Sequence, residues 1–292
     1  MKERRIFFNA EDGMELAGII SEPENKTNKI VVSIHGMTSN CLKKREYKLA
    51  KAMTQNRIAY FSFSNRGHDL MSFGTLSKEQ KICGTVYEEV LDSIYDVIGA
   101  LKTVKKMGYT DVYIQGHSLG STKVVYSYQK LKKQDLELSK MIKAVILLSL
   151  IDIPRCQKIY VGENYKEFLD YAEAKEKQGK QMEIMPLNSF ISPISVKNYL
   201  RYVRDNQEID FAKYHDSSYE FKELNSIDVP LFMRWGDQKE MIEQEPEKLV
   251  ELLKHKIHNP NLNINYIKGA DHSYHGKEEI LAEQILKFLL TK

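Results

Sequence analysis

Short apolar runs and longer helical patterns alternate along most of this chain. The first region differs, because three strand-like runs follow one another with only turn signals between them, Glu11-Asp12-Gly13 and Glu22-Pro23-Glu24-Asn25. This arrangement predicts an antiparallel start to a sheet. The three expected strands are Ile6–Phe8, Glu15–Ile20 and Ile30–Ile34.

Beyond this region, the regular alternation of strand and helix predicts a mostly parallel sheet with crossover helices. The run Ala144–Leu150 is almost wholly apolar, which is typical of a strand buried on both faces. Further strands are expected at Ile58–Ser62, Asp111–Gln115, Leu231–Trp235 and Asn263–Ile267, and helices at about 42–56, 86–107, 119–131, 245–255 and 278–290.

The alternation stops between about Pro154 and Ile227. This segment is rich in charged residues and tyrosines, and its apolar residues have helical spacing with no convincing strand. We therefore predict an α/β core in two parts, residues 1–153 and 228–292, interrupted by a helical cap insertion at residues 154–227.

Composition narrows the classes of function. The 292 residues are 42% hydrophobic and 28% charged, which is ordinary for a soluble globular protein. The 43 basic and 40 acidic side chains are spread without a long run of one sign, so we expect no nucleic-acid partner. No apolar run approaches the roughly 18 residues that a spanning helix needs, so we expect no stable membrane insertion. The oligomeric state stays unknown.

The N-terminus and the cysteines bear on location. The chain turns polar at once after its first residues and lacks the apolar run of a signal peptide. Its three cysteines, Cys41, Cys83 and Cys156, are odd in number and far apart, which argues against a disulfide framework or a zinc cluster. Both features favour a cytoplasmic protein with reduced thiols.

One motif carries nucleophile chemistry. Gly116-His117-Ser118-Leu119-Gly120 fits Gly-x-Ser-x-Gly and lies where a predicted strand must turn sharply into a predicted helix. The turn strains the backbone at Ser118, and glycines without a Cβ let the two arms pack closely. The helix N-terminus also favours negative charge there. The alternative is a turn that merely connects strand to helix, and the flanking elements favour the nucleophile.

With this motif in place, the sequence resembles the α/β-hydrolase superfamily over nearly the whole chain outside the predicted cap. The resemblance implies an α/β fold with a twisted, mostly parallel sheet of about eight strands. It also implies catalytic residues in the order nucleophile, acid, histidine. Asp237 follows Gly236 at the end of a predicted strand, where the family keeps its acid, and His272 lies where the family has its histidine.

The chemistry needs all three residue types. A serine hydroxyl is a poor nucleophile until an imidazole takes its proton, and a carboxylate fixes the tautomer of that imidazole. Asp152, after the preceding strand, and Asp271 are alternatives to Asp237 as the acid, and His275 is the alternative to His272. No cysteine or acidic cluster joins the two histidines at ligand spacing, so we expect no metal site.

The dipeptide His35-Gly36 follows a predicted strand and resembles the family's oxyanion loop. The resemblance implies that the backbone amides of Met37 and Leu119 bind the oxyanion of the tetrahedral intermediate. His35 itself is open to a structural role, bonded to its own loop. The segment Asn65-Arg66-Gly67-His68-Asp69 resembles the Arg-Gly-His-Gly segment that follows another strand in many α/β hydrolases, with Asp69 in place of the second glycine. It is expected to be mainly structural. His117 is expected to pack against neighbouring strands, and Lys123 has no assigned role.

The sequence thus predicts a serine hydrolase that cleaves carboxylic esters of small acyl or aromatic substrates through an acyl-enzyme, without a cofactor. It resembles cytoplasmic acyl and cinnamoyl-type esterases. The alternatives are a thioesterase, amidase, peptidase or acyltransferase of the same fold, a catalytically silent ligand-binding protein, and a scaffolding role through the charged cap. Two interpretations of the aromatic side chains of the cap stay open. They form the core of the cap itself, or several of them line the acyl pocket.

Overall fold

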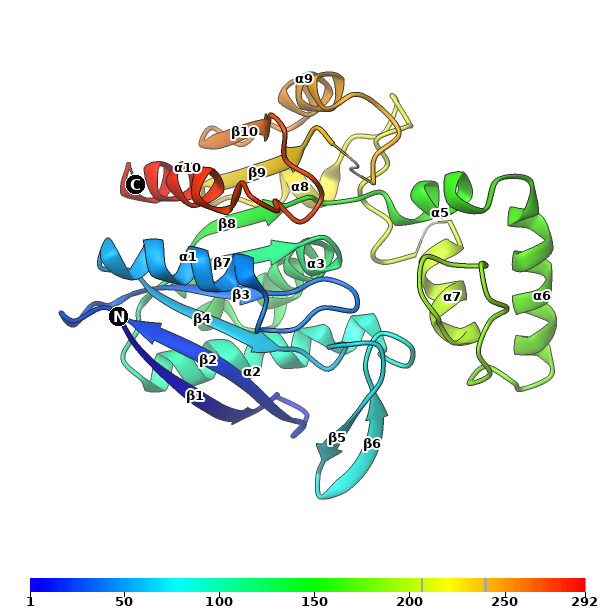
Figure 1. Ribbon diagram of the computed structural model, residues 1–292, viewed down its shortest axis with the longest axis horizontal. Helices are drawn as coiled ribbons and strands as arrows, with labels where there is room; N and C mark the ends of the chain where they lie inside the picture. The colour runs from blue at the N-terminus through cyan, green and yellow to red at the C-terminus, as the bar shows by residue number, and fades with distance from the viewer. Residues whose placement is uncertain (206, 239–240, 292) are drawn as a thin grey trace.

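A computed structural model describes residues 1–205, 207–238 and 241–291. Its centre is an eight-stranded sheet with strand order β1-β2-β4-β3-β7-β8-β9-β10 (Figure 1). β2 runs antiparallel to both its neighbours, and the other neighbouring pairs are parallel. The strands of this sheet are β1 (Lys2–Asn9), β2 (Glu15–Glu22), β3 (Lys29–Ile34), β4 (Ala59–Ser64), β7 (Asp111–His117), β8 (Ile142–Leu148), β9 (Leu231–Gly236) and β10 (Leu262–Ile267).

Helices cover both faces of the sheet. α1 and α10 pack side by side on one face, and α2, α3 and α9 pack on the other (Figure 1). In the described ranges, no helix is both long enough and apolar enough to cross a membrane. The helices of the core are α1 (Lys44–Gln55), the 3₁₀ turn η1 (Val90–Asp92), α2 (Ser93–Lys106), α3 (Leu119–Gln134), α4 (Leu136–Met141), α9 (Pro246–Lys256) and α10 (Glu278–Leu290).

The apolar core has two layers because successive residues of a strand point to opposite faces of a sheet. In β3, Val31 packs in the layer beneath α1 and α10, and Val32 packs in the layer beneath α2 and α3. In β8, Ile146 and Val145 divide in the same way, and both are fully buried. The mostly parallel sheet, its antiparallel start and the doubly buried strand are therefore confirmed.

Residues 154–227, called the cap segment below, lie between β8 and β9. In Figure 1, α5, α6 and α7 extend beyond the carboxyl ends of β3, β7 and β8. The predicted helical character is confirmed, and the limits of this segment as a separate unit stay a prediction. Its elements, together with the residue that precedes it, are α5 (Ile153–Val161), the 3₁₀ turn η2 (Gly162–Asn164), α6 (Tyr165–Lys177), α7 (Val196–Val203) and α8 (Lys222–Asn225).

Part of the aromatic content of the cap segment forms its own core. Phe190 stacks on Tyr202 with ring centroids 6.0 Å apart and meets Tyr199 edge to face at 6.2 Å. All three side chains are buried. These three side chains therefore pack against one another within the cap segment, and Phe190 also lines a pocket beside Ser118 that is described below.

Two features of the chain differ from expectation. The helix expected at 86–107 begins only at Ser93, because residues 84–87 form a turn and Val90–Asp92 form the 3₁₀ turn η1, while the Glu88 side chain between them is buried in an ion pair. The hairpin β5 (Ser72–Leu76) and β6 (Glu79–Cys83) was not predicted. Its turn residues adopt left-handed backbone conformations without the glycine or asparagine that usually signals such a turn.

Candidate active site

Ser118 lies at the turn between β7 and α3, with φ 55° and ψ −126°. Its amide donates a hydrogen bond to the carbonyl oxygen of Leu148 on the neighbouring strand at 2.8 Å. A Cβ on Gly116 would lie 2.3 Å from the carbonyl oxygen of Gly120, and one on Gly120 would lie 2.2 Å from that of Ile34. Both glycines are therefore required for the close packing that holds the strained Ser118 backbone in place.

The His35-Gly36 loop packs directly against this turn. A Cβ on Gly36 would lie 2.8 Å from the carbonyl oxygen of His117 and 2.9 Å from the Cβ of Ser118. In the part of the chain that the structure describes, the Met37 amide donates to no protein acceptor. Leu119 is the first residue of α3, where an amide has no acceptor within the helix. Two amides beside Ser118 are thus left to bind an oxygen.

His35 has a structural role. Its side chain is buried, its Nδ1–H donates to the carbonyl oxygen of Gly36 at 2.8 Å, and its Nε2 accepts from the amide of Asn65 at 3.1 Å. Burial, with the charge of Lys123, lowers the pKa of His35 to about 3. A neutral imidazole satisfies both contacts, so His35 joins the oxyanion loop to the segment that follows β4.

The loop that carries His272 is attached to the nucleophile turn through its backbone. The carbonyl oxygen of His272 accepts hydrogen bonds from Nε2–H of His117 at 2.7 Å and from Oγ of Ser149 at 3.2 Å. Burial, together with the charge of Arg45, holds the pKa of His117 well below its usual value. His117 was expected to pack against neighbouring strands, and it also donates a hydrogen bond to the backbone of His272.

Asp237 follows β9 and contacts the same loop. A Cβ on Gly236 would lie 2.2 Å from the carbonyl oxygen of Ala270, so the two segments touch backbone to backbone. The amide of Asp237 donates to Ala270 at 3.1 Å, and Oδ1 of Asp237 accepts from the amide of Gly269 at 2.7 Å. The carboxylate thus lies against the loop that presents His272.

The two alternative acids have other partners. Oδ1 of Asp152 caps α5 by accepting from the amide of Arg155 at 3.1 Å, and Oδ2 pairs with Nδ1 of His215 at 2.7 Å. Asp271 pairs through Oδ2 with Nδ1 of His275, also at 2.7 Å, and the His275 side chain is 73% exposed. Asp152 and Asp271 are thus each paired with a histidine other than His272.

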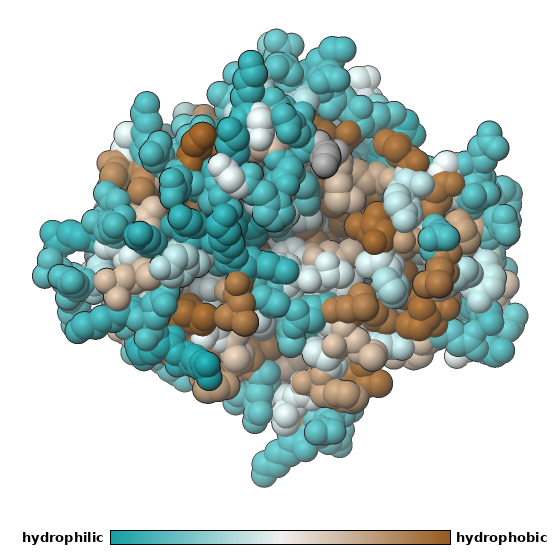
Figure 2. Space-filling model, in the orientation of Figure 1, coloured by the Kyte–Doolittle hydropathy of each residue, from teal (hydrophilic) through white to brown (hydrophobic). Residues whose placement is uncertain are grey.

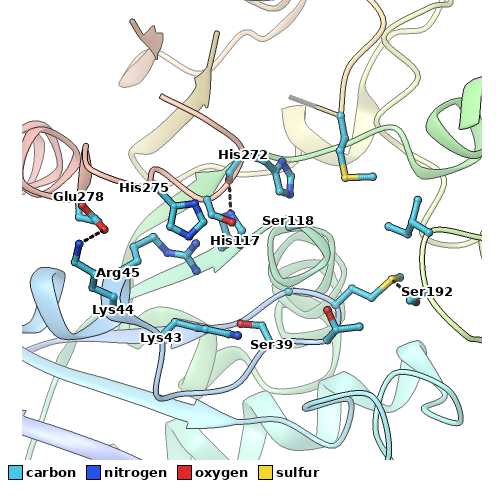
Figure 3. A pocket seen from close by; sticks show the side chains of 16 residues that line it. Ser39, Lys43, Lys44, Arg45, His117, Ser118, Ser192, His272, His275 and Glu278 are labelled. Carbon is cyan, nitrogen blue, oxygen red and sulfur yellow. Dashed lines mark hydrogen bonds and ion pairs between the residues drawn. The ribbon is translucent and has the colours of Figure 1, made fainter. Parts of the chain in front are cut away.

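Ser118, His272 and Met37 line one polar pocket with a volume of about 380 Å³ (Figure 3). Asp237 is not part of its lining. The remaining lining residues described for this pocket, called the polar chamber below, are Gly36, Thr38, Ser39, Lys43, Lys44, Arg45, His117, Ile191, Ser192, Met241, Ser273, His275 and Glu278.

A second, narrow pocket of about 30 Å³ shares Met37, Ser118, Ile191 and Met241 with the polar chamber. We call it the apolar slot. Figure 2 shows hydrophobic side chains gathered toward the cap segment, to the right of a hollow near the middle of the face. The slot is lined by Met37, Ser118, Leu119, Ile151, Ile153, Cys156, Gln157, Phe190, Ile191 and Met241.

The sequence interpretation gave Lys123 no role, and the structure shows that it is the centre of a buried polar cluster. Its ammonium donates to Oε2 of Glu88 at 2.6 Å and to Oδ1 of Asn65 at 3.0 Å, and both charged side chains are fully buried. The hydroxyl of Tyr202, from α7, donates to the other oxygen of Glu88 at 3.4 Å. The cluster therefore connects the nucleophile helix to the cap segment.

No group of three or more His, Cys, Asp and Glu side chains is arranged to hold a metal ion within residues 1–205, 207–238 and 241–291.

No known family profile matches the sequence, and no curated protein matches it either. Several solved structures match over nearly the whole chain. Est1E from Butyrivibrio proteoclasticus, with ferulic acid bound, is 19% identical, with a TM-score of 0.68 and 98% of each chain covered. The Pyrococcus furiosus esterase Pf2001 is 18% identical, with a TM-score of 0.59, covering 99% of this chain and 91% of that one.

The α/β hydrolase GrgF from Penicillium sp. sh18 is 14% identical, with a TM-score of 0.64, covering 99% of this chain and 98% of that one. At these identities the likeness concerns the fold. The chain has the α/β-hydrolase fold, as its sequence predicted.

Proposed function

We propose that the protein is a serine hydrolase, a carboxylesterase that cleaves esters of small acyl groups. Ser118 is the nucleophile, His272 the general base, Asp237 the acid that orients it, and the amides of Met37 and Leu119 form the oxyanion hole. The observation that carries the proposal is that the strained Ser118, His272 and Met37 open into one pocket.

The steps follow from these roles. His272 takes the proton of the Ser118 hydroxyl as Oγ bonds to the carbonyl carbon of the ester, and the two amides stabilise the negative oxygen. His272 then gives that proton to the leaving oxygen, and the carbon–oxygen bond breaks to leave an acyl-enzyme. Water, activated by His272, attacks the acyl-enzyme and releases the acid.

Two of the similar structures are named as esterases, and Est1E holds ferulic acid, which supports ester hydrolysis as the activity. The narrowness of the apolar slot favours short acyl groups for this chain. An aromatic acyl group requires rearrangement of the side chains that line the slot, with Phe190 and Ile191 foremost.

The experiment is labelling of the purified protein with a fluorophosphonate probe, with hydrolysis of p-nitrophenyl esters of increasing acyl length. Wild type should label and turn over the shortest esters fastest, and Ser118→Ala should do neither. A folded wild-type protein that neither labels nor hydrolyses any ester would favour a ligand-binding protein without catalysis.

The acid is tested separately with matched amide variants. Asp237→Asn should lower kcat by about 10⁴-fold, because the imidazole tautomer would be wrong while the shape is kept. Asp152→Asn should leave kcat within about threefold, since Asp152 bonds His215 and α5. If Asp152→Asn is the crippling variant and Asp237→Asn is mild, Asp237 is not the acid.

A further inference from the structure

We propose that the substrate's leaving group is anionic: the alcohol released from the ester carries a carboxylate or phosphate that binds Arg45 and the first turn of α1. This inference rests on the proposed ester hydrolysis and names the substrate class of the same site.

The position of His272 separates the two halves of the substrate. The leaving oxygen must lie beside the histidine that protonates it, and His272 lines the polar chamber. The apolar slot is lined by both residues of the oxyanion hole, Met37 and Leu119, and His272 is absent from its lining. The acyl group therefore enters the slot, and the alcohol portion lies in the polar chamber.

Positive charge dominates the chamber. Three consecutive cationic residues, Lys43, Lys44 and Arg45, line it at the start of α1, and Glu278 is the one carboxylate among its described lining residues. Glu278 lies 3.4 Å from the ammonium of Lys44. Among the described residues, no acidic group lies within ion-pair distance of Lys43. The chamber thus has cationic groups beyond those that its own carboxylate neutralises.

Arg45 is the strongest element of this site. Its side chain is 6% exposed, and Nε and Nη2 donate to one oxygen of Glu46 at 3.2 and 2.9 Å. The other oxygen of Glu46 accepts from the hydroxyls of Ser33 and Tyr60, both at 2.7 Å, which holds the pair in place. Within the described residues, Nη1 of Arg45 donates to no protein acceptor.

Figure 3 shows the Arg45 guanidinium directed into the chamber, near His117. The charge of Arg45 also acts on His117, which lines the chamber. After burial, this charge is the largest cause that lowers the pKa of His117. A rigid, buried guanidinium with unused donors is suited to binding the oxygens of a carboxylate or phosphate.

The N-terminus of α1 adds a second anion-binding element. The helix has 12 residues, and its N-cap residue, Lys43, makes no side-chain capping bond. The amides of the first turn therefore lack side-chain acceptors, and the helix dipole favours negative charge at this end. The positive end of this dipole and the guanidinium of Arg45 belong to the same turn of chain, so both favour an anion in the chamber.

The test compares three acetyl esters whose alcohols are 4-hydroxybenzoate, 4-hydroxyphenyl phosphate and methyl 4-hydroxybenzoate. Each enzymatic kcat/KM is divided by the rate of the same ester with hydroxide, which removes differences in leaving-group reactivity. We expect wild type to favour at least one charged ester over the neutral one by about tenfold or more, the size of one charge-assisted hydrogen bond. Whichever charged ester is favoured identifies the group as carboxylate or phosphate.

Variants assign the effect to the site. Arg45→Gln should lower the ratio of the normalised kcat/KM for the favoured charged ester to that for the neutral ester by about tenfold. Lys43→Gln should lower it less, and because Lys43 is exposed this variant remains informative if Arg45→Gln does not fold. Lys48→Gln is the matched control, since Lys48 lies on the same helix and pairs with Glu279 outside the chamber. Its ratio should equal that of wild type.

A wild type that labels with fluorophosphonate and hydrolyses the neutral ester as well as the charged ones would overturn this inference and leave the proposed function intact. A ratio that is equal in wild type, Arg45→Gln and Lys43→Gln would overturn it too. A folded protein that neither labels nor cleaves any of the three esters would instead contradict the proposed function itself.

Discussion

The buried pair of Lys123 and Glu88 offers a sharp test of how the nucleophile helix is joined to the cap segment. Lys123→Met keeps most of the side-chain volume and removes the ammonium. Glu88 then retains only the long contact from Tyr202, and its carboxylate stays in a fully buried position. A Cβ on Gly67 would lie 1.9 Å from Oε2 of Glu88, so the carboxylate packs directly against the backbone of Gly67.

Removing one partner of a buried pair costs about 3–5 kcal/mol, because the remaining charge is uncompensated. Equilibrium unfolding in urea, followed by circular dichroism, measures this loss. Lys130→Met is the matched control on the same helix, and its loss should stay below about 1 kcal/mol because its ion pair with Glu208 is exposed to solvent.

The double variant Lys123→Met/Glu88→Gln separates the buried charge from other causes. It should regain more than half of the loss, since a neutral amide costs less to bury than an unpaired carboxylate. A loss below about 1 kcal/mol for Lys123→Met, or a double variant as unstable as the single one, would refute the reasoning.

Three further predictions concern the surroundings of Ser118. Gly36→Ala should lower kcat/KM for p-nitrophenyl acetate by about tenfold or more at unchanged circular dichroism, because its Cβ would displace the oxyanion loop from His117 and Ser118. The unfolding free energy should fall as pH drops below 6.5, by up to about 1.4 kcal/mol per pH unit from His35, whose pKa is about 3 when folded, since only the unfolded state then binds this proton. His35→Asn should flatten this part of the stability–pH curve, and an unchanged slope would contradict the assignment. Asn198→Ala should lower the free energy of unfolding by about 1–3 kcal/mol and speed proteolysis of the cap segment. The reason is that the side-chain amide of Asn198 donates to the buried carbonyl oxygens of Thr85 and Val86.

The sequence predicted the features that depend on local pattern. β8 is apolar from Ala144 to its end, and the turn at Ser118 needs glycines at fixed positions next to it, so both can be recognised within a few residues of chain. The loop positions of Asp237 and His272 follow from the resemblance to the α/β hydrolases, and their catalytic roles stay predictions.

The features that the sequence left unpredicted depend on pairing between distant segments. Lys123 and Glu88 are 35 residues apart, and either one alone is typical of a solvated helix face. Arg45 is buried because two strands supply the hydroxyls that hold its partner Glu46. The late start of α2 was also missed, since residues 84–87 form a turn and η1 precedes the helix.

The hydrogen bonds described for the Ser118 turn and the His272 loop bear on how amino-acid substitutions would affect this protein. Their partners, His117, Leu148 and Ser149 among them, belong to the sheet and to its carboxyl-terminal turns. The cap segment supplies side chains to the apolar slot, including Phe190 and Ile191. Substitutions there can therefore alter which acyl group is accepted while the reacting groups keep their positions. In engineering terms, the cap side chains that line the slot are the positions to vary, while Tyr202 and Asn198, which contact the core, are the ones to keep.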